Sequence, residues 1–394
     1  MAQSPDPFDW LPGALTGLEQ EGLLRTRRVR SGLQSGADGS QGGIVDFGSN
    51  DYLGLANDPR LAEAAANACR DHAWGSGASP VVSGRTEWHA ELERQLADFE
   101  QAEAAMLFPS GYAANSGVIP ALVGERDAIL ADAKNHASLI DGCRLSRAER
   151  FIYRHNDADH LGELLKKAGG YRRQLIVTDG LFSMDGDFAP LVEISELAER
   201  HGAMLLVDEA HATGVWGDHG RGSVEHFGVD HSATLRVGTL SKALGSIGGF
   251  VVGDQRLIDW LYNRARPYVF STAPPAAIAA AGLAALQIVR QEPERRQRVV
   301  SLAEGLRARL QARGWSTGDS TSQIVPIRVG GPEAAVALSQ RLAKLGVFAP
   351  AIRPPSVPEG ESLLRISLSC AHSEEDLERL LEGLGEADQA SSTV

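Results

Sequence analysis

The chain has 394 residues, of which 43% are hydrophobic and 23% charged, which is ordinary for a globular protein with a large core. Its 51 acidic and 38 basic residues give a net charge of −13, and the dense basic run is confined to Arg25–Arg30, so nucleic-acid binding is disfavoured. The longest apolar stretch, Ala276–Leu286, is too short to span a bilayer. The N-terminus lacks the basic and apolar segments of a signal peptide, and the three cysteines are widely separated, so we expect a cytoplasmic protein with no membrane partner.

Residues 1–43 are expected to form an arm and a linker ahead of the main body. An amphipathic pattern at Leu15–Arg28 predicts a helix, and a glycine- and serine-rich linker follows from Ser31. A short strand at Ile44–Phe47 then begins the body of the protein. Asp58 and Pro59 are of the types that form an N-cap and a first helical residue, so the next helix is expected to start there.

Residues 44–275 are expected to form a large α/β domain. Apolar runs alternate with helical patterns, and continuous apolar strands joined by crossover helices imply a mostly parallel sheet covered by helices on both faces. Ligands of such sheets gather at the carboxyl ends of the strands. The predicted strands are Ala105–Phe108, Ala128–Leu130, Phe151–Tyr153, Leu175–Thr178, Met204–Val207, Leu235–Gly238 and Phe250–Val252.

Residues 276–394 are expected to form a smaller α+β domain, because longer helical patterns replace the strand-helix alternation. The last residues, from Asp388, have the composition of a frayed tail. The predicted elements are helices at Ala277–Arg290, Glu294–Arg313 and Glu333–Leu345, strands at Gln323–Val329 and Leu363–Ser369, and a final helix from Ser373.

Two charged residues stand where buried strands end. Asp208 follows the apolar run Leu205–Val207, where a bare carboxylate is costly unless a cation or several donors face it. Lys242 lies in T-L-S-K-A-L-G, among small residues and outside any amphipathic helix. A turn-capping aspartate and a solvated surface lysine are the ordinary alternatives for such residues.

The string V-D-E-A-H, which ends at His211, also matches the DEAH box of ATP-hydrolysing helicases. That class needs an upstream G-x-x-x-x-G-K-[ST] loop that binds the nucleotide phosphates. The chain contains no Gly-Lys dipeptide, and its charge is acidic. A nucleic-acid motor is therefore disfavoured.

Pyridoxal phosphate is a cofactor that would use both charged residues. It needs a lysine for its imine, an anion facing its pyridine nitrogen and donors for its phosphate. Gly111, in P-S-G-Y-A-A-N, follows a strand and opens a helix, whose first N–H groups could bind the phosphate. A simple Ser-Gly turn is the alternative there. Thr239 and Ser241 could add hydroxyl donors beside Lys242.

Six strings occur in order between Ser49 and Pro358: S-N-D-Y-L-G-L, N-H-A-S-L-I-D-G, F-S-M-D-G-D-F-A-P-L, V-D-E-A-H-A-T-G, T-L-S-K-A-L-G and A-I-R-P-P-S-V-P. Together they resemble the α-oxoamine synthase family, which consists of pyridoxal-phosphate enzymes of fold type I. The resemblance covers nearly the whole chain. It implies a large domain built on a mostly parallel sheet, a smaller C-terminal domain and a homodimer with its active site at the interface.

The resemblance also implies a catalytic role for each matching position. Lys242 would hold the cofactor through an imine and then act as a base, and Asp208 would face the pyridine nitrogen. His211 would hydrogen-bond the ring oxygen, with Ser183 close to it. His136 would stack on the face of the cofactor, although a helix-start or core histidine is the alternative from the residues alone.

The phosphate cradle would consist of Gly111, Tyr112 and Thr239, as the family match implies. Because the family's site lies at a dimer interface, Ser271 and Thr272 would reach the phosphate held by the partner. A helix cap ahead of the following prolines is the alternative for these two hydroxyls. No metal ion is implied.

The string at Ala351–Pro358 is most similar to one branch of the family. That branch joins L-alanine to a pimeloyl thioester, carried by coenzyme A or by a carrier protein, with loss of carbon dioxide, in biotin biosynthesis. Arg365 would bind the carboxylate of the amino acid, Asn50 would contact the substrate, and Arg25 would lie at the acyl-donor site. Other family members, which use glycine or serine with another acyl donor, and a protein that binds the cofactor without turnover are the alternatives.

One segment departs from the branch. Arg85 stands where many members carry an aromatic residue, and Pro80 is unusual in the loop before it. Both are expected near the approach path of the acyl chain or the amino acid.

Overall fold

The structure is a computed structural model that describes residues 6–25, 27, 29, 44–229 and 234–385. The predicted glycine-rich linker and the tail from Asp388 lie outside these residues. Among the residues described, no helix is long and apolar enough to cross a membrane.

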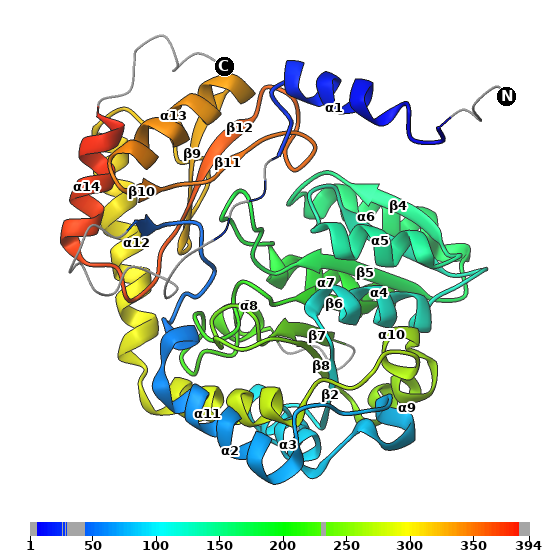
Figure 1. The fold of residues 1–394 in the computed structure, drawn as a ribbon. Coiled ribbons are helices and arrows are strands. Elements are labelled where there is room, and N and C mark those ends of the chain that lie inside the picture. The colour runs from blue at the N-terminus through cyan, green and yellow to red at the C-terminus, as the bar shows by residue number, and fades with distance from the viewer. Residues whose placement is uncertain (1–5, 26, 28, 30–43, 230–233, 386–394) are drawn as a thin grey trace, which may run out of the picture.

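A seven-stranded sheet in the order β2-β8-β7-β6-β5-β3-β4 is the centre of the larger part of the protein (Figure 1). Neighbouring strands are parallel except at β8, which is antiparallel to both β7 and β2. The predicted mostly parallel sheet and its predicted strands are therefore confirmed. The strands are β2 (Ala104–Phe108), β3 (Ala128–Asp132), β4 (Glu149–Tyr153), β5 (Gln174–Asp179), β6 (Met204–Asp208), β7 (Thr234–Thr239) and β8 (Gly249–Gly253).

Both faces of this sheet are buried, as its continuous apolar strands require. Along β2, Ala105 and Leu107 pack into one hydrophobic cluster, whereas Ala104 and Met106 pack into another. Successive side chains of a strand point to opposite faces, so helices cover both sides of the sheet. One face packs against α3 (Glu87–Glu100), α6 (Ala158–Lys167), α7 (Leu191–His201) and α11 (Ala276–Gln291), and the other against α4 (Gly111–Leu122), α5 (Ala137–Leu145), α9 (Gln255–Arg264) and α10 (Arg266–Val269).

The N-terminal helix differs from the prediction. Helix α1 (Leu11–Gln20) begins before Leu15 and ends well before Arg28, and none of its residues is buried. The chain turns at Gly22, whose φ of 67° lies in the left-handed region that favours glycine and ends helices. The amphipathic pattern that predicted a longer helix therefore continues past a glycine that stops it.

The next helix begins where the sequence predicted. In α2 (Pro59–His72), the Asp58 side chain accepts a hydrogen bond from the N–H of Arg60, so Asp58 is the N-cap. The segment between β1 (Val45–Asp46) and α2 contains the short helix η1 (Leu55–Asn57).

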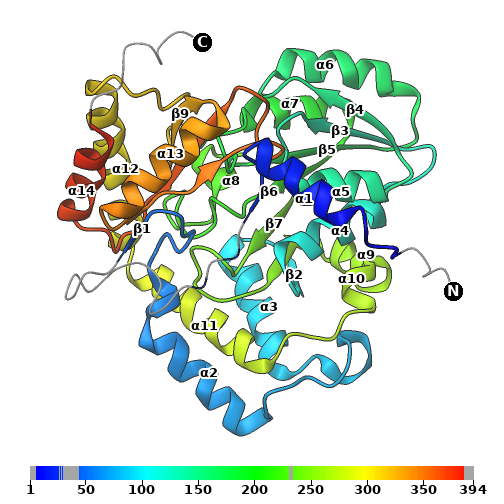
Figure 2. The ribbon, with the colours of Figure 1, turned by 45° about the horizontal axis from the view of Figure 1, so that its top comes forward.

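A separate three-stranded antiparallel sheet, in the order β11-β12-β9, forms the C-terminal part and lies beside its own helices (Figures 1 and 2). The predicted helices and strands of this part are confirmed, and the short strands β10 and β11 were not predicted. The elements are α12 (Glu294–Ala312), β9 (Ile324–Gly330), α13 (Pro332–Lys344), β10 (Val347–Phe348), β11 (Ala351–Ile352), β12 (Ser362–Ser367) and α14 (Glu374–Leu384).

The chain crosses between the two parts more than once. Strand β1 pairs in parallel with β10, so Val45 lies opposite Val347 although the sequence places it ahead of the large sheet. Helix α11, the first predicted element of the small domain, packs against α2 and α3 (Figure 1). The domain boundaries at residues 43 and 275 stay predictions.

Candidate active site

The candidate site lies along the carboxyl edge of the seven-stranded sheet. The parallel strands β3, β5, β6 and β7 all end at this edge. The turn after β3 carries His136, β5 ends at Asp179, β6 ends at Asp208, and the loop after β7 carries Lys242. The sheet thus gathers side chains that are far apart in sequence.

Lys242 is held by a histidine rather than by a carboxylate. Its Nζ lies 2.8 Å from Nε2 of His211, and among the described residues it makes no ion pair. Burial lowers the pKa of Lys242, and the nearby charge of Asp208 offsets only part of this effect, so the pKa is about 8. At pH 7 about one tenth of this amine therefore carries a lone pair, far more than in a lysine of ordinary pKa.

His211 is buried and stays neutral. Burial lowers its pKa well below the usual range, and the positive charges of Lys242 and Arg365 lower it further. Its Nδ1 lies 2.6 Å from the hydroxyl of the buried Tyr52. The carbonyl of His211 accepts a hydrogen bond from Nε2 of the Gln323 amide at 2.7 Å. The imidazole is thus fixed against the lysine.

Asp208 is buried and accepts two hydrogen bonds. Nδ2 of Asn115 donates to its Oδ2 at 2.6 Å, and the N–H of Ala210 donates to its Oδ1 at 2.8 Å. Nδ2 of Asn115 also donates to the hydroxyl of Ser138 at 2.9 Å. These donors hold the carboxylate in one orientation at the end of β6.

The same network reaches His136. The N–H of Ser138 donates to Nδ1 of His136 at 3.2 Å, so Nδ1 carries the lone pair and also accepts from the Ser138 hydroxyl at 2.8 Å. The backbone N–H of His136 donates to the Asp179 carboxylate at 2.7 Å. Burial lowers the pKa of His136, while burial and the neighbouring Asp208 raise that of Asp179.

Arg365 crosses from the small sheet to this cluster. Its Nε donates to the carbonyl of Ser183 at 2.5 Å, and its Nη1 donates to Oδ1 of Asn50 at 3.0 Å and to the hydroxyl of Ser367 at 2.6 Å. Its Nη2 is buried and has no partner among the described residues. A buried guanidinium with an unused donor fits an external carboxylate, because leaving such a donor unpaired is costly.

The end of the site near α4 has the form of an anion cradle. Gly111 is the first residue of α4, and the first N–H groups of a helix have no partner within it. A side chain at Gly249 would come within 2.4 Å of the Ser110 carbonyl oxygen, so the glycine lets β8 approach the start of the helix. The Thr239 hydroxyl lies beside this turn and donates to the carbonyl of Gly248 at 2.7 Å.

Other predicted site residues lie away from the cluster or at the surface. Tyr112 is half exposed and donates from its hydroxyl to Asp141, and Thr272 is exposed. Arg25 is also exposed, and its charge acts on Arg353 of the C-terminal part. The predicted roles of these residues stay predictions.

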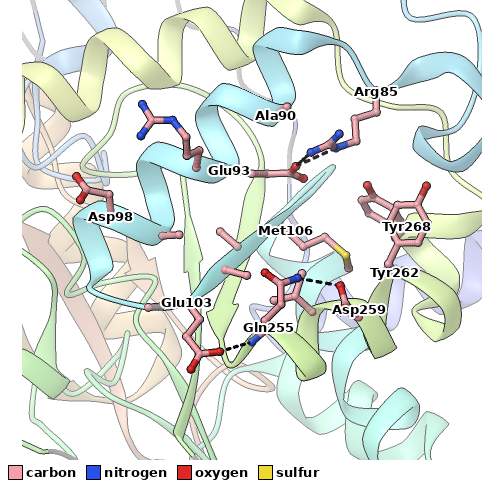
Figure 3. A pocket seen from close by; sticks show the side chains of 16 residues that line it. Arg85, Ala90, Glu93, Asp98, Glu103, Met106, Gln255, Asp259, Tyr262 and Tyr268 are labelled. Carbon is pink, nitrogen blue, oxygen red and sulfur yellow. Dashed lines mark hydrogen bonds and ion pairs between the residues drawn. The ribbon is translucent and has the colours of Figure 1, made fainter.

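Within one chain, Arg85 does not reach the cluster around Lys242. Its Nε and Nη2 donate to Oε2 of Glu93 at 2.9 and 2.6 Å. It lines a cavity of about 770 Å³ bordered by α3, β2 and α9, where Tyr262 and Tyr268 also lie (Figure 3). The residues lining this cavity include none of the predicted site residues. A single subunit therefore gives no support to the expected place of Arg85 on the substrate path.

Several residues of the cluster were not singled out from the sequence. Tyr52 and Asn115 lie inside the quoted strings S-N-D-Y-L-G-L and P-S-G-Y-A-A-N, so a signal existed for them. Asp179 directly follows a predicted strand, as Asp208 does, and the same argument about a carboxylate at a strand end could have found it. Gln323 had no signal beyond its place at the start of a strand.

These groups fit pyridoxal phosphate. A half-buried amine that forms no ion pair within the described part of the chain, a buried carboxylate oriented by an amide, and a helix start held open by glycine match what the aldehyde, the ring nitrogen and the phosphate each require. The fold and the site thus define a pyridoxal-phosphate enzyme of fold type I.

Comparison with known proteins places the chain in a family. Residues 43–384 match the family model of class I and II aminotransferases. An 8-amino-7-oxononanoate synthase from Symbiobacterium thermophilum is 48% identical over 95% of this chain and 96% of that protein. A second one, from Geobacter sulfurreducens, is 47% identical over 95% of this chain and 96% of that protein. The chain belongs to the class I and II aminotransferase family and, within it, to the group of the 8-amino-7-oxononanoate synthases.

Solved structures agree with this result. Serine palmitoyltransferase from S. paucimobilis, with a pyridoxal phosphate–myriocin adduct bound, matches with a TM-score of 0.90 and 32% identity over 96% of this chain and 98% of that one. An 8-amino-7-oxononanoate synthase from Francisella tularensis matches with a TM-score of 0.76 and 28% identity over 88% of this chain and 97% of that one. The predicted family, fold type and cofactor are confirmed.

Proposed function

We propose that this protein condenses L-alanine with a pimeloyl thioester to give 8-amino-7-oxononanoate, a free thiol and carbon dioxide, in biotin biosynthesis. The observation that carries the proposal is the pairing of Lys242 with His211 at the sheet edge, together with a buried Arg365 whose Nη2 has no partner in the part of the chain that the structure describes. Such a site holds an amino acid by its carboxylate next to an amine that can accept a proton. The relatives named above support the substrates.

Lys242, Asp208, His211, His136 and Gly111 would hold the cofactor. When bound, pyridoxal phosphate supplies an electron sink for the electron pair left on the α-carbon of the amino acid. Asp208 provides the carboxylate that would face the pyridine nitrogen, and Asn115 holds this carboxylate in orientation by donating to it at 2.6 Å.

Lys242 would take the α-proton of alanine. A general base works best when its pKa lies near the working pH, and the pKa of Lys242 is about 8 because burial disfavours its charged form. The neutral His211 at 2.8 Å can share the proton of this amine without adding a second positive charge. The same residue pair can return the proton after carbon dioxide leaves.

Arg365 would bind the alanine carboxylate through Nη2. Three hydrogen bonds, to Ser183, Asn50 and Ser367, fix the guanidinium plane and leave that one donor directed at a ligand. A carboxylate held on one side of the site sets which bond of the α-carbon faces Lys242.

We infer a homodimer in which Thr272 and its neighbour Ser271 complete the phosphate site of the partner. The exposed position of Thr272 and the half-exposed Tyr112 support this assembly, because both remain open for a second subunit. We also infer a cytoplasmic location, in line with the three free cysteines. Arg25 would then contact the acyl donor together with the adjoining Arg353.

The test is thiol release by the holoenzyme with crossed substrates. L-alanine, glycine and L-serine are each combined with pimeloyl, succinyl, acetyl and palmitoyl thioesters of coenzyme A, and pimeloyl carrier protein is tested with alanine. Alanine with a pimeloyl thioester is expected to be fastest. Faster thiol release with glycine and a short acyl donor would overturn the assignment of alanine and a pimeloyl thioester as substrates, but it would support the same class of reaction. A change in cofactor absorbance with alanine, but no thiol release with any pair, would show a binding protein.

A further inference from the structure

We propose that His155 is a positioning residue, which clamps the turn that carries His136 to the turn that carries Ser183. The proposal rests on the proposed function, since it concerns how those two turns are held around the amino-acid site. His155 itself follows β4, and its contacts within the described part of the chain are with Asp132, Asp187 and Phe182, not with the groups expected to touch the cofactor or the substrate.

Both ring nitrogens of His155 reach carboxylates. Nδ1 lies 2.9 Å from Oδ1 of Asp132, and Nε2 lies 3.0 Å from Oδ2 of Asp187. The side chain is only 19% exposed, and its ring meets the ring of Phe182 edge-on with a centroid distance of 4.5 Å. An imidazole between two carboxylates donates from both nitrogens only when it is protonated.

On one side, the clamp fixes the approach to His136. Asp132 ends β3, and its two carboxylate oxygens accept hydrogen bonds from the N–H groups of Lys134 and Asn156 at 2.8 and 2.9 Å. The turn between Asp132 and His136 thus closes on a carboxylate that His155 holds in place. His136 follows directly as the N-cap of α5.

On the other side, the clamp fixes the turn around Ser183. The N–H of Phe182 donates to the carbonyl of Asp187 at 2.9 Å, so these two residues close a loop that contains Ser183. His155 contacts both ends of this loop, the Phe182 ring and the Asp187 carboxylate. The Ser183 carbonyl in turn accepts the hydrogen bond from Nε of Arg365. A shift of this loop would therefore turn the guanidinium that is proposed to bind alanine.

Other charged groups face the clamp. Nζ of Lys134 lies 3.1 Å from Oδ2 of Asp185, and Nη2 of Arg328 lies 3.4 Å from Oδ1 of the same residue, so a second ion pair joins the two turns. Nδ2 of Asn156 donates to Asp187 at 2.9 Å. Burial lowers the pKa of His155, but the hydrogen bonds and charges of Asp132 and Asp187 outweigh it and raise the pKa to about 9.

The same residues could be mistaken for a metal site, because ligand atoms of His155, Asp185 and Asp187 lie within 4.8 Å of one another. A metal ion would need a lone pair on His155. The two carboxylates instead keep both nitrogens protonated near neutral pH. The position of the ring between Asp132 and Asp187 thus favours a charged clamp over a ligand.

The test compares His155→Gln with His160→Gln, a control in the same segment whose imidazole, among the described residues, accepts a hydrogen bond from the N–H of Arg154 alone. Amide hydrogen exchange of the protein without cofactor is measured first. His155→Gln is expected to speed exchange at least tenfold in residues 133–137 and 182–188, whereas the control leaves it unchanged. Exchange that is unchanged in both variants would overturn the clamp whatever the fate of the proposed function.

The second readout is the dissociation constant of L-alanine, measured on the holoenzyme by cofactor absorbance without an acyl donor. His155→Gln is expected to raise the dissociation constant of alanine about tenfold at pH 7. The ratio of the variant's dissociation constant to that of wild type should fall toward 1 above pH 9, where His155 loses its charge. Asp187→Asn should weaken alanine similarly, with no added loss in the double variant. Equal alanine affinity of wild type and His155→Gln at pH 7 would contradict the proposal. So would one Zn²⁺ ion bound per wild-type subunit with loss of both hydrogen bonds of His155.

Discussion

The amine of Lys242 and Nε2 of His211 lie 2.8 Å apart, and Nδ1 of the same histidine lies 2.6 Å from the hydroxyl of Tyr52. Burial keeps His211 neutral and lowers the pKa of Lys242 to about 8, so the pair carries at most one positive charge near neutral pH. This relationship explains how a lysine at the end of a buried sheet becomes reactive: a neutral partner replaces the carboxylate that would otherwise hold its proton.

Replacing Lys242 with alanine should abolish the reaction. The variant loses both the amine that captures the cofactor and the base, and we expect thiol release to fall by at least about 10³-fold. The wild-type holoenzyme should absorb above 400 nm, and borohydride reduction should remove this absorbance. Lys344→Ala, at an exposed position of α13, is the control and should keep both colour and rate. Wild-type colour and rate in Lys242→Ala would contradict the assignment.

The pKa of Lys242 predicts how fast cofactor is captured. Only the neutral amine attacks the aldehyde, so for apoenzyme mixed with pyridoxal phosphate the rate should rise about tenfold per pH unit below 8 and level off above it. Stopped-flow absorbance measures the rate. A lysine with an ordinary pKa would give a rate still climbing steeply between pH 8.5 and pH 10, and that result would exclude the proposed environment.

Asn115 should affect turnover more than alanine binding. It donates to Asp208 at 2.6 Å, and an Asn115→Ala substitution would leave that buried carboxylate with one donor fewer. Removing a hydrogen bond to a charged group costs about 1.5–3 kcal/mol, so kcat should fall about tenfold to 100-fold while the KM for alanine changes little. Steady-state kinetics separate the two. A large rise in KM at unchanged kcat would assign Asn115 to substrate binding instead.

Arg365 should show the opposite pattern. An Arg365→Met substitution removes the proposed carboxylate ligand, so the KM for alanine should rise about tenfold to 100-fold, by the loss of one or two charge-assisted hydrogen bonds. Arg341→Met is the matched control, because that arginine donates to the carbonyl of Leu384 far from the cluster. An unchanged KM in Arg365→Met would remove Arg365 from the amino-acid site.

His155 should contribute stability that depends on pH. Its folded pKa of about 9 lies above its ordinary value of 6.5, so its contribution is complete below pH 6.5 and is lost as the pH rises through 9. The difference in unfolding free energy between wild type and His155→Gln should reach up to about 3 kcal/mol at pH 6 and approach zero at pH 10. Urea unfolding at the two pH values measures it. A difference that grows with pH would show that the imidazole is not charged in the folded protein.

The fold could be predicted because its signals are local. Runs such as Leu205–Val207 are apolar throughout, and they alternate with helical patterns, which is enough to predict a mostly parallel sheet covered on both faces. The predicted Leu15–Arg28 helix is wrong because Gly22 adopts the left-handed conformation after the end of α1, although the hydrophobic periodicity continues past it. The pairing of β1 with β10 joins segments about 300 residues apart and leaves no local signal.

Part of the site could be predicted from the sequence. Lys242 and Asp208 stand out because a charge at the end of a buried strand needs an explanation, and the family resemblance then supplied His136 and His211. Asn115 could not be found this way, because its role depends on its hydrogen bond to Asp208, which is distant in sequence. The place of Arg85 stays a prediction: its segment departs from the family pattern near the expected substrate path, and within one subunit its guanidinium pairs with Glu93.

The most direct test of the account follows the carbon that alanine loses. Holoenzyme is incubated with pimeloyl-coenzyme A and L-alanine labelled with ¹³C in its carboxylate, and thiol, labelled carbon dioxide and aminoketone are measured together by absorbance and mass spectrometry. Decarboxylative condensation predicts equal amounts of the three products, with no label in the aminoketone. About one equivalent of labelled pyruvate per active site, with the amino group left on the cofactor and no thiol or carbon dioxide released, would show that the protein is an aminotransferase in activity as well as in family, and would contradict the proposed condensation.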